Sequence, residues 1–142
     1  MKIHITDAPN SSDETYVIQN LWAHNQQYSD VDIRPLFLTI TDNNKIIAGL
    51  VAKTWWGGLE IQYLWVDEKY RKKGFGRQLM LQAEEEALKR HCHMAYVDTF
   101  SFQARGFYEK LGYKVYGELG EYAHKYTRFY LAKKFSVSNH MR

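Results

Sequence analysis

The sequence predicts an α/β (α+β) fold, in which a mixed, mostly antiparallel sheet of six to seven strands carries helices on both faces. Two observations lead to this prediction. Segments rich in β-branched and aromatic residues alternate with tight turns on both sides of residue 75, and two longer segments show the three- and four-residue spacing of amphipathic helices. A strand, a helix and another strand follow one another over residues 59–100, and such a crossover implies a parallel pair, which we expect at the centre of the sheet.

The first third of the chain should hold a short edge strand, a helix and two strands. Residues 2–6 alternate, as an edge strand would. Ser11 or Ser12 can cap a helix that places an apolar stripe toward the core. The stripe consists of Val17, Ile18, Leu21 and Trp22. Strands are then predicted at residues 36–41 and 45–56, joined at Asn43 and Asn44, residues that tolerate positive φ.

The rest of the chain continues this pattern after a Gly57-Gly58 turn. The order strand, helix, strand, helix, two strands completes the predicted sheet. The expected ranges are strands at 59–66, 94–100, 113–118 and 126–135, and helices from 75 to near 90 and over 103–111.

Length and composition predict one domain over residues 1–142, with a loose tail at 136–142. The net charge of +3, from 19 basic and 16 acidic side chains, is too small to indicate nucleic-acid binding. A single cysteine, Cys92, excludes an internal disulfide and fits a reducing compartment. No apolar run reaches the roughly 20 residues of a membrane span. We therefore expect a cytoplasmic protein with no nucleic-acid or membrane partner.

The predicted strand at residues 59–66 leads into a basic, glycine-bearing turn. Alternation is expected to place Leu59, Ile61, Tyr63 and Trp65 on one face of this strand. The turn, whose sequence is Arg-Lys-Lys-Gly-Phe-Gly over residues 71–76, opens directly into a helix. The N–H groups of a first helical turn and the helix dipole attract anions, and glycine allows a ligand to approach the backbone. This stretch therefore predicts an anion-binding site.

Two motifs indicate which anion this is. The turn contains neither a Walker A loop nor the full G-x-G-x-x-G dinucleotide fingerprint. Its R-x-x-G-x-G pattern resembles the pyrophosphate-binding motif of the GNAT superfamily of N-acetyltransferases. Residues 104–113, ARGFYEKLGY, are similar to the second motif of that superfamily and follow one strand later, as its fold requires. The resemblance covers roughly residues 36–135.

The resemblance implies an N-acetyltransferase that uses acetyl-CoA as acyl-donor cosubstrate, needs no metal, and transfers the acetyl group to a primary amine by direct attack. Ser101 stands where the superfamily often has an asparagine that bonds the pantetheine arm, and it has a shorter reach. The residues expected to bind the donor are Trp65, Val66, Arg71, Lys72, Lys73, Gly74, Phe75, Gly76, Arg77 and Ser101.

Two side chains are candidates for proton transfer. Glu60 begins the strand before the glycine turn, where some GNAT enzymes carry a carboxylate base, and the alternative is an exposed carboxylate after a turn. Tyr108, in the second motif, would donate a proton to the departing CoA thiolate, and the alternative is a core tyrosine. Backbone N–H groups near Trp65 and Val66 could stabilise the thioester oxygen.

Other interpretations remain open. The fold could serve as a non-catalytic acyl-CoA sensor, or the basic turn could bind nucleic acid, although no aromatic platform alternates with its cations. His91, Cys92 and His93 are adjacent and cannot all converge on one metal ion. Either Trp55 or Trp56 could line the acceptor site or a homodimer contact. The amine acceptor, whether small molecule, antibiotic, peptide or protein, is not specified by any motif.

Overall fold

The computed structural model describes residues 1–136, so residues 137–142 of the expected tail lie outside the described part of the chain. The chain divides into two units, residues 1–32 and a second unit that begins at Ile33. The prediction of a single domain is not tested by this division and stays a prediction.

The first unit contains one helix, α1 (Ser11–Asn25). Asn10, rather than Ser11 or Ser12, caps it, because the Asn10 side chain accepts a hydrogen bond from the Ser12 N–H at 2.9 Å. The prediction of a strand at residues 2–6 is wrong, since an edge strand needs a neighbour and residues 1–32 contain no strand. Within this unit α1 also has no other helix or strand to pack against, so its predicted apolar stripe is not part of a core there.

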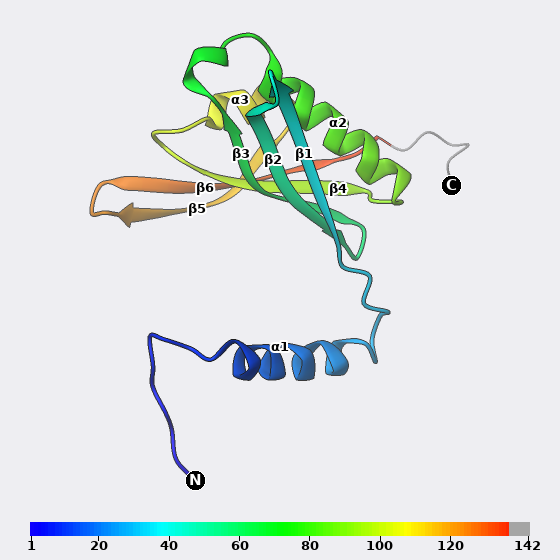
Figure 1. Ribbon diagram of the computed structural model, residues 1–142, viewed down its shortest axis with the longest axis vertical. Helices are drawn as coiled ribbons and strands as arrows, with labels where there is room; N and C mark the ends of the chain where they lie inside the picture. The colour runs from blue at the N-terminus through cyan, green and yellow to red at the C-terminus, as the bar shows by residue number, and fades with distance from the viewer. Residues whose placement is uncertain (137–142) are drawn as a thin grey trace. The chain divides into compact units, whose positions relative to one another are not determined.

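The second unit is a six-stranded sheet with two α-helices (Figure 1). Its strand order is β1-β2-β3-β4-β6-β5, in which β3 and β4 are parallel and the other neighbouring strands are antiparallel. This arrangement confirms the predicted mixed sheet and its parallel unit. The elements are β1 (Arg34–Asp42), β2 (Lys45–Trp55), β3 (Gly58–Val66), a 3-10 helix η1 (Glu68–Tyr70), α2 (Phe75–Lys89), β4 (Met94–Phe100), α3 (Arg105–Lys110), β5 (Lys114–Tyr122) and β6 (Tyr126–Lys134).

The core of this unit lies between α2 and the sheet. Helix α2 crosses β1, β2 and β3 and buries an apolar stripe at helical spacing, formed by Leu79, Met80, Ala83 and Ala87. Helix α3 lies on the same face, because Phe107 reaches Gly76 at the start of α2. The expected helix on the opposite face stays a prediction, since α1 belongs to the other unit.

The turns between the first strands follow the sequence signals closely. Asn43 and Asn44 both have positive φ, as predicted for the β1–β2 hairpin. In the next hairpin the positive-φ residues are Trp56 and Gly57, rather than the predicted Gly57-Gly58 pair.

None of the helices among the described residues is long and apolar enough to cross a membrane.

Candidate active site

The two parallel strands at the centre of the sheet pair over a short stretch only. Strands β3 and β4 pair at only three register positions, from Gly58↔Met94 to Glu60↔Tyr96. Beyond them, β1–β3 and β4–β6–β5 run in clearly different directions (Figure 1). The backbone of β3 from Ile61 to Val66 therefore has no partner strand on its β4 side, and its N–H and C=O groups on that edge can bind an extended ligand.

A β-bulge in β3 changes which of its side chains face the core. Val51 pairs with Tyr63 while Ala52 pairs with Ile61, so Gln62 is an extra residue. Leu59 and Ile61 are buried, whereas Tyr63 is 71% and Trp65 50% exposed. The prediction that these four residues share one face is therefore wrong, because the inserted residue reverses the alternation halfway along the strand.

The glycine turn begins α2 with unpaired backbone donors, as predicted. Gly74 has φ of 83° and is the N-cap of the helix. The first backbone bond of the helix runs from the Gln78 N–H to the Gly74 carbonyl at 3.0 Å. Among the described residues, the N–H groups of Phe75, Gly76 and Arg77 have no acceptor, so three donors at the positive end of the helix dipole remain available.

Basic residues flank these donors in the sequence, at positions 71–73 and 77, and the first turn of α2 holds no acidic residue. The Arg71 Nε donates to the Val66 carbonyl at 3.1 Å, which joins the loop to the end of β3. Lys72 has φ of 65°, and the Lys73 ammonium lies 5.4 Å from the centre of the Tyr70 ring. Phosphate oxygens are the ligand chemistry that such a cationic turn fits.

Glu60 lies where the β3–β4 pairing ends, and its carboxylate is held by two donors. The Tyr96 hydroxyl donates to Glu60 Oε1 at 3.0 Å and the Trp55 Nε1 donates to the same oxygen at 3.2 Å. Burial, followed by the hydrogen bond to Glu60, raises the pKa of Tyr96, which keeps the phenol protonated as a donor. Neither donor was predicted from the sequence, because the pairing of β3 with β4 brings Tyr96 opposite Glu60 and the pairing of β2 with β3 brings Trp55 close to it.

Tyr108 is a core residue whose hydroxyl lacks a partner. The side chain is 6% exposed, and its ring contacts those of Phe107 and Tyr113. Among the described residues its hydroxyl makes no hydrogen bond. Burial, and to a lesser degree the charge of Asp98, raises the pKa of Tyr108 to about 12. The structure therefore agrees with the core interpretation of the ring and leaves the hydroxyl able to donate.

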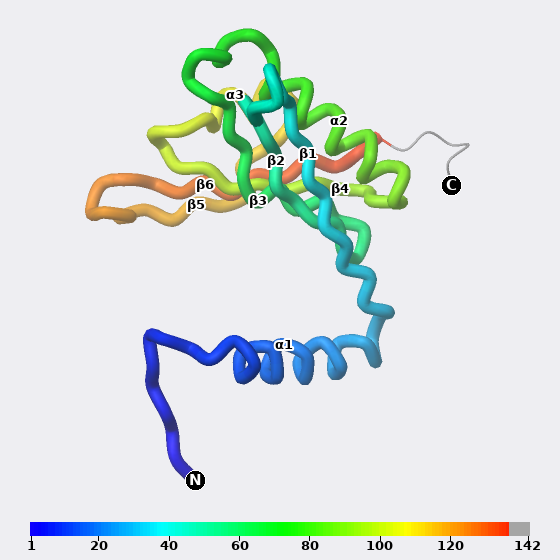
Figure 2. Tube along the Cα trace, viewed as in Figure 1, coloured from blue at the N-terminus to red at the C-terminus, as the bar shows by residue number. Residues whose placement is uncertain are grey.

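Ser101 sits at the end of β4, where its hydroxyl joins the β5–β6 hairpin. The Ser101 Oγ accepts from the Thr127 N–H at 3.2 Å, and the Ser101 N–H donates to the Thr127 carbonyl at 2.8 Å. Figure 2 shows the loop after β4 and this hairpin extending in the same direction. A contact with the donor would use the Ser101 O–H as a donor while its oxygen remains bonded to Thr127.

Asp98, on β4, forms an ion pair that the sequence analysis did not predict. It forms a two-point ion pair with Arg128 of β6, at 3.1 Å from Nε to Oδ1 and 2.8 Å from Nη2 to Oδ2. The same arginine lies over the Tyr130 ring at 5.0 Å. No sequence signal could have found this pair, because it depends on the pairing of two strands 30 residues apart.

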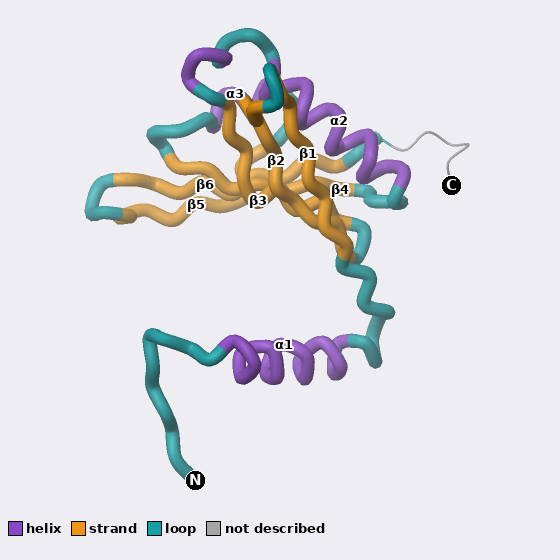
Figure 3. Tube along the Cα trace, viewed as in Figure 1, coloured by secondary structure: helices purple, strands orange, loops and turns teal. Residues whose placement is uncertain are grey.

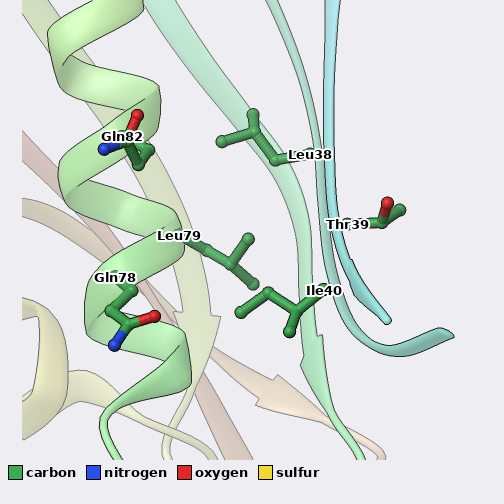
Figure 4. A pocket seen from close by; sticks show the side chains of 6 residues that line it. All are labelled: Leu38, Thr39, Ile40, Gln78, Leu79 and Gln82. Atoms are coloured by element: carbon green, nitrogen blue, oxygen red, sulfur yellow. The ribbon is translucent and has the colours of Figure 1, made fainter. Parts of the chain in front are cut away.

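A shallow hollow of about 240 Å³ lies elsewhere, between β1 and α2 (Figure 4). Leu38, Ile40 and Leu79 point toward one another across it, and Gln78 and Gln82 border it. β2 lies between β1 and the β3–β4 pair, so this hollow is not part of the predicted site.

In the part of the chain that the structure describes, no three His, Cys, Asp or Glu side chains converge as metal ligands would.

The chain is similar to known proteins in both sequence and fold. The model of the acetyltransferase (GNAT) family matches residues 2–113. The chain belongs to the GNAT acetyltransferase family. Membership makes it an acyltransferase and confirms the resemblance on which the two motifs were interpreted.

Individual relatives support the same assignment. The crystal structure of an acetyltransferase from Agrobacterium tumefaciens is 35% identical with a TM-score of 0.89, and the match covers 95% of this chain and 100% of that one. The blasticidin-S acetyltransferase of Streptomyces morookaense is 32% identical over 109 residues, which are 73% of this chain and 80% of that protein. A Bacillus anthracis acetyltransferase in complex with acetyl coenzyme A is 25% identical with a TM-score of 0.65, over 71% of this chain and 62% of that one.

Replacing Gly74 with valine tests the glycine turn. The new side chain enters open space, since no protein atom lies within 4 Å of the point that its Cβ would occupy, but positive φ costs a β-branched residue roughly 2 kcal/mol. We expect CoA affinity, measured by calorimetry, to fall on the order of tenfold or more because at least one charge-assisted hydrogen bond to a phosphate is lost. The melting temperature should fall by several degrees. Undiminished CoA affinity in a folded Gly74→Val protein would contradict this assignment of the turn.

Proposed function

We propose that this protein transfers the acetyl group of acetyl-CoA to a primary amine by direct attack of the amine on the thioester. The observation that carries the proposal is the edge of β3 that has no partner strand, with Glu60 at its start and the cationic glycine turn after its end. Val66 is six residue steps along the strand from Glu60, or about 20 Å. An extended donor anchored by its phosphates at α2 would therefore present its reactive end toward Glu60.

The phosphates are assigned to the N–H groups of residues 75–77 and the cations of the turn. The arm would follow the unpaired edge of β3 past Trp65 and Val66. The Val66 N–H is proposed to donate to it, because the strand register directs the backbone groups of Trp65 toward β2. Ser101 is proposed as a further contact from β4. The family match, and the acetyl-CoA complex of the Bacillus anthracis relative, support acetyl-CoA as the donor.

The acceptor must lose a proton before it can attack. Alkyl ammonium groups have pKa values around 10, so most of the acceptor is protonated at neutral pH. We assign Glu60 to this step, directly or through water. The supporting observation is that Tyr96 and Trp55 both bond Oε1, which orients the carboxylate at the point where the strands separate.

The transfer itself forms one bond and breaks another. The amine nitrogen bonds to the thioester carbon, and the carbonyl oxygen gains negative charge, which N–H groups of β3 would stabilise. The carbon–sulfur bond then breaks, and the thiolate takes a proton. Tyr108 is assigned as the source of that proton, because its hydroxyl is otherwise unbonded among the described residues.

The acceptor class is tested by measuring CoA release in the presence of a panel of amines. The panel should include blasticidin S, on which the Streptomyces morookaense relative acts by its name, together with other amine antibiotics, polyamines and peptides. Thiol release that depends on one amine, with an acetylated product of the matching mass, would support the proposal. Tight CoA binding without any turnover across the panel would instead favour the acyl-CoA sensor.

Replacing Glu60 with glutamine removes the proposed base and keeps its shape. With an amine acceptor, turnover should fall most at low pH and recover toward pH 10, where free amine is abundant. The measurement is a pH profile of CoA release, and Glu85→Gln, an exposed change on α2, is the matched control. A wild-type rate for Glu60→Gln at every pH would remove Glu60 from the mechanism.

Replacing Tyr108 with phenylalanine removes the proposed acid and keeps the packed ring. Turnover should fall about 10²- to 10⁴-fold if proton transfer limits the step, with CoA affinity and melting temperature nearly unchanged. Because the pKa of Tyr108 is raised to about 12, its proton is retained below that pH, so the wild-type rate should not decline between pH 7 and 10 through loss of this acid.

Tyr113→Phe provides the structural contrast. Its buried hydroxyl donates to Glu84 at 2.8 Å, so the variant should melt earlier and keep its turnover once folded. If Tyr108→Phe behaves like Tyr113→Phe, Tyr108 is a core residue only.

A further inference from the structure

The loop that enters α2 is attached to a distant turn by one side chain. The Tyr70 hydroxyl donates to Asp42 Oδ2 at 2.6 Å, and 28 residues separate the two in the sequence. Asp42 ends β1, at the turn into β2, and Tyr70 ends η1, just before the glycine turn. Figure 3 shows this turn and the η1 loop at the same end of the sheet.

The Tyr70 ring also contacts the residues that open the proposed phosphate site. The Lys73 ammonium lies over the ring at 5.4 Å from its centre, which is a cation–π distance. The Phe75 ring, at the first position of α2, lies 6.3 Å away, centre to centre. Tyr70 is thus in contact with residues on both sides of Gly74.

Besides this contact, the loop is held by the bond from the Arg71 Nε to the Val66 carbonyl and by bonds within the loop. No residue of η1 is buried, so it is not anchored by a core contact of its own. Its local bonds are short-range: the Lys69 N–H donates to Asp67 Oδ1 at 2.9 Å and the Tyr70 N–H to the Asp67 carbonyl at 2.8 Å. Positive φ at Lys72 costs conformational energy that surrounding contacts must offset.

The hydrogen bond has an electrostatic consequence as well. Asp42 is an anion close to a loop that is proposed to hold phosphates, and the donated proton of Tyr70 partly neutralises it. The hydrogen bond to Asp42 is the main cause of a raised pKa at Tyr70, so the phenol remains protonated and donates through neutral pH.

We infer that Tyr70 is a positioning residue for the diphosphate of the acyl donor: held by Asp42, its ring places Lys73 and the first turn of α2 in the geometry that binds the anion. The inference rests on the proposed function, because it assumes that CoA binds at this turn. Preorganising a loop in its bound conformation raises affinity by reducing the ordering cost of binding.

The experiment compares CoA binding to the wild type, Tyr70→Phe and Tyr70→Leu by calorimetry. Tyr70→Phe keeps the ring beneath Lys73 and removes only the hydrogen bond, and we expect the Kd for CoA to rise about three- to tenfold. Tyr70→Leu also removes the ring and should weaken binding further. Tyr28→Phe, an exposed tyrosine in the other unit, is the matched control and should bind as the wild type does.

Changes at Asp42 separate the hydrogen bond from the charge. Asp42→Asn keeps an acceptor for the Tyr70 hydroxyl, so CoA should bind as tightly as to the wild type, or more tightly because a negative charge is gone. Asp42→Ala should also weaken binding, but less than Tyr70→Phe does, because it removes the negative charge together with the hydrogen bond. The double variant Tyr70→Phe/Asp42→Ala should bind no more weakly than either single variant, since both remove one interaction.

Thermal unfolding with and without CoA distinguishes positioning from a structural role. We expect Tyr70→Phe to unfold at nearly the wild-type temperature without ligand and to show a smaller stabilisation by CoA. Wild-type CoA affinity in both Tyr70→Phe and Asp42→Ala, or an early melting temperature with unchanged affinity, overturns the inference alone. A wild-type protein that does not bind CoA overturns the proposed function on which the inference rests.

Discussion

The end of the pairing between β3 and β4 is the constraint on which the rest of the site depends. Three register pairs hold the parallel strands together, and after Glu60↔Tyr96 the strands separate. Separation leaves one edge of β3 without a ladder partner, and a buried or ligand-facing edge must find other partners for its N–H and C=O groups. The bulge at Gln62 lies just beyond this point and turns Tyr63 and Trp65 out of the core. Glu60 is therefore placed by the last rung of the ladder, where Tyr96 bonds its carboxylate.

A sheet that opens in this way needs another connection between its halves, and α2 provides it. Its apolar stripe packs on β1, β2 and β3, while Glu84, on the same helix, reaches toward the other half. This carboxylate is only 7% exposed and is bonded by the Tyr113 hydroxyl at 2.8 Å and by the Lys133 ammonium at 2.7 Å. A buried charge is tolerated when it is paired and hydrogen-bonded, and removal of one partner leaves an uncompensated group. The helix that follows the glycine turn therefore contacts both halves of the sheet, β1–β3 through its apolar stripe and the β4–β6–β5 half through Glu84, which limits how far the two halves can move apart.

Much of the fold could be predicted because its signals are local. Asn43 and Asn44 tolerate positive φ and form the first hairpin turn, Gly74 does so at the start of α2, and the β4 bounds agree with those predicted. The failures occur where a pattern depends on a partner. Residues 2–6 alternate like a strand but have no strand beside them in their unit. The alternation of β3 ends at a bulge, which is a property of the pairing between two strands rather than of either sequence.

The sequence by itself determined the family, the glycine turn and the position of that turn between a strand and a helix, because each is a short run of residues whose backbone chemistry is read in order. Only the tertiary structure decided which side chains meet. The two donors on Glu60, the Asp98–Arg128 pair and the Tyr70–Asp42 bond all join segments whose contact depends on strand register or on the packing of a loop against a turn. A change of one residue in register would move each of these side chains to the opposite face of the sheet or out of reach, and no local propensity encodes that choice.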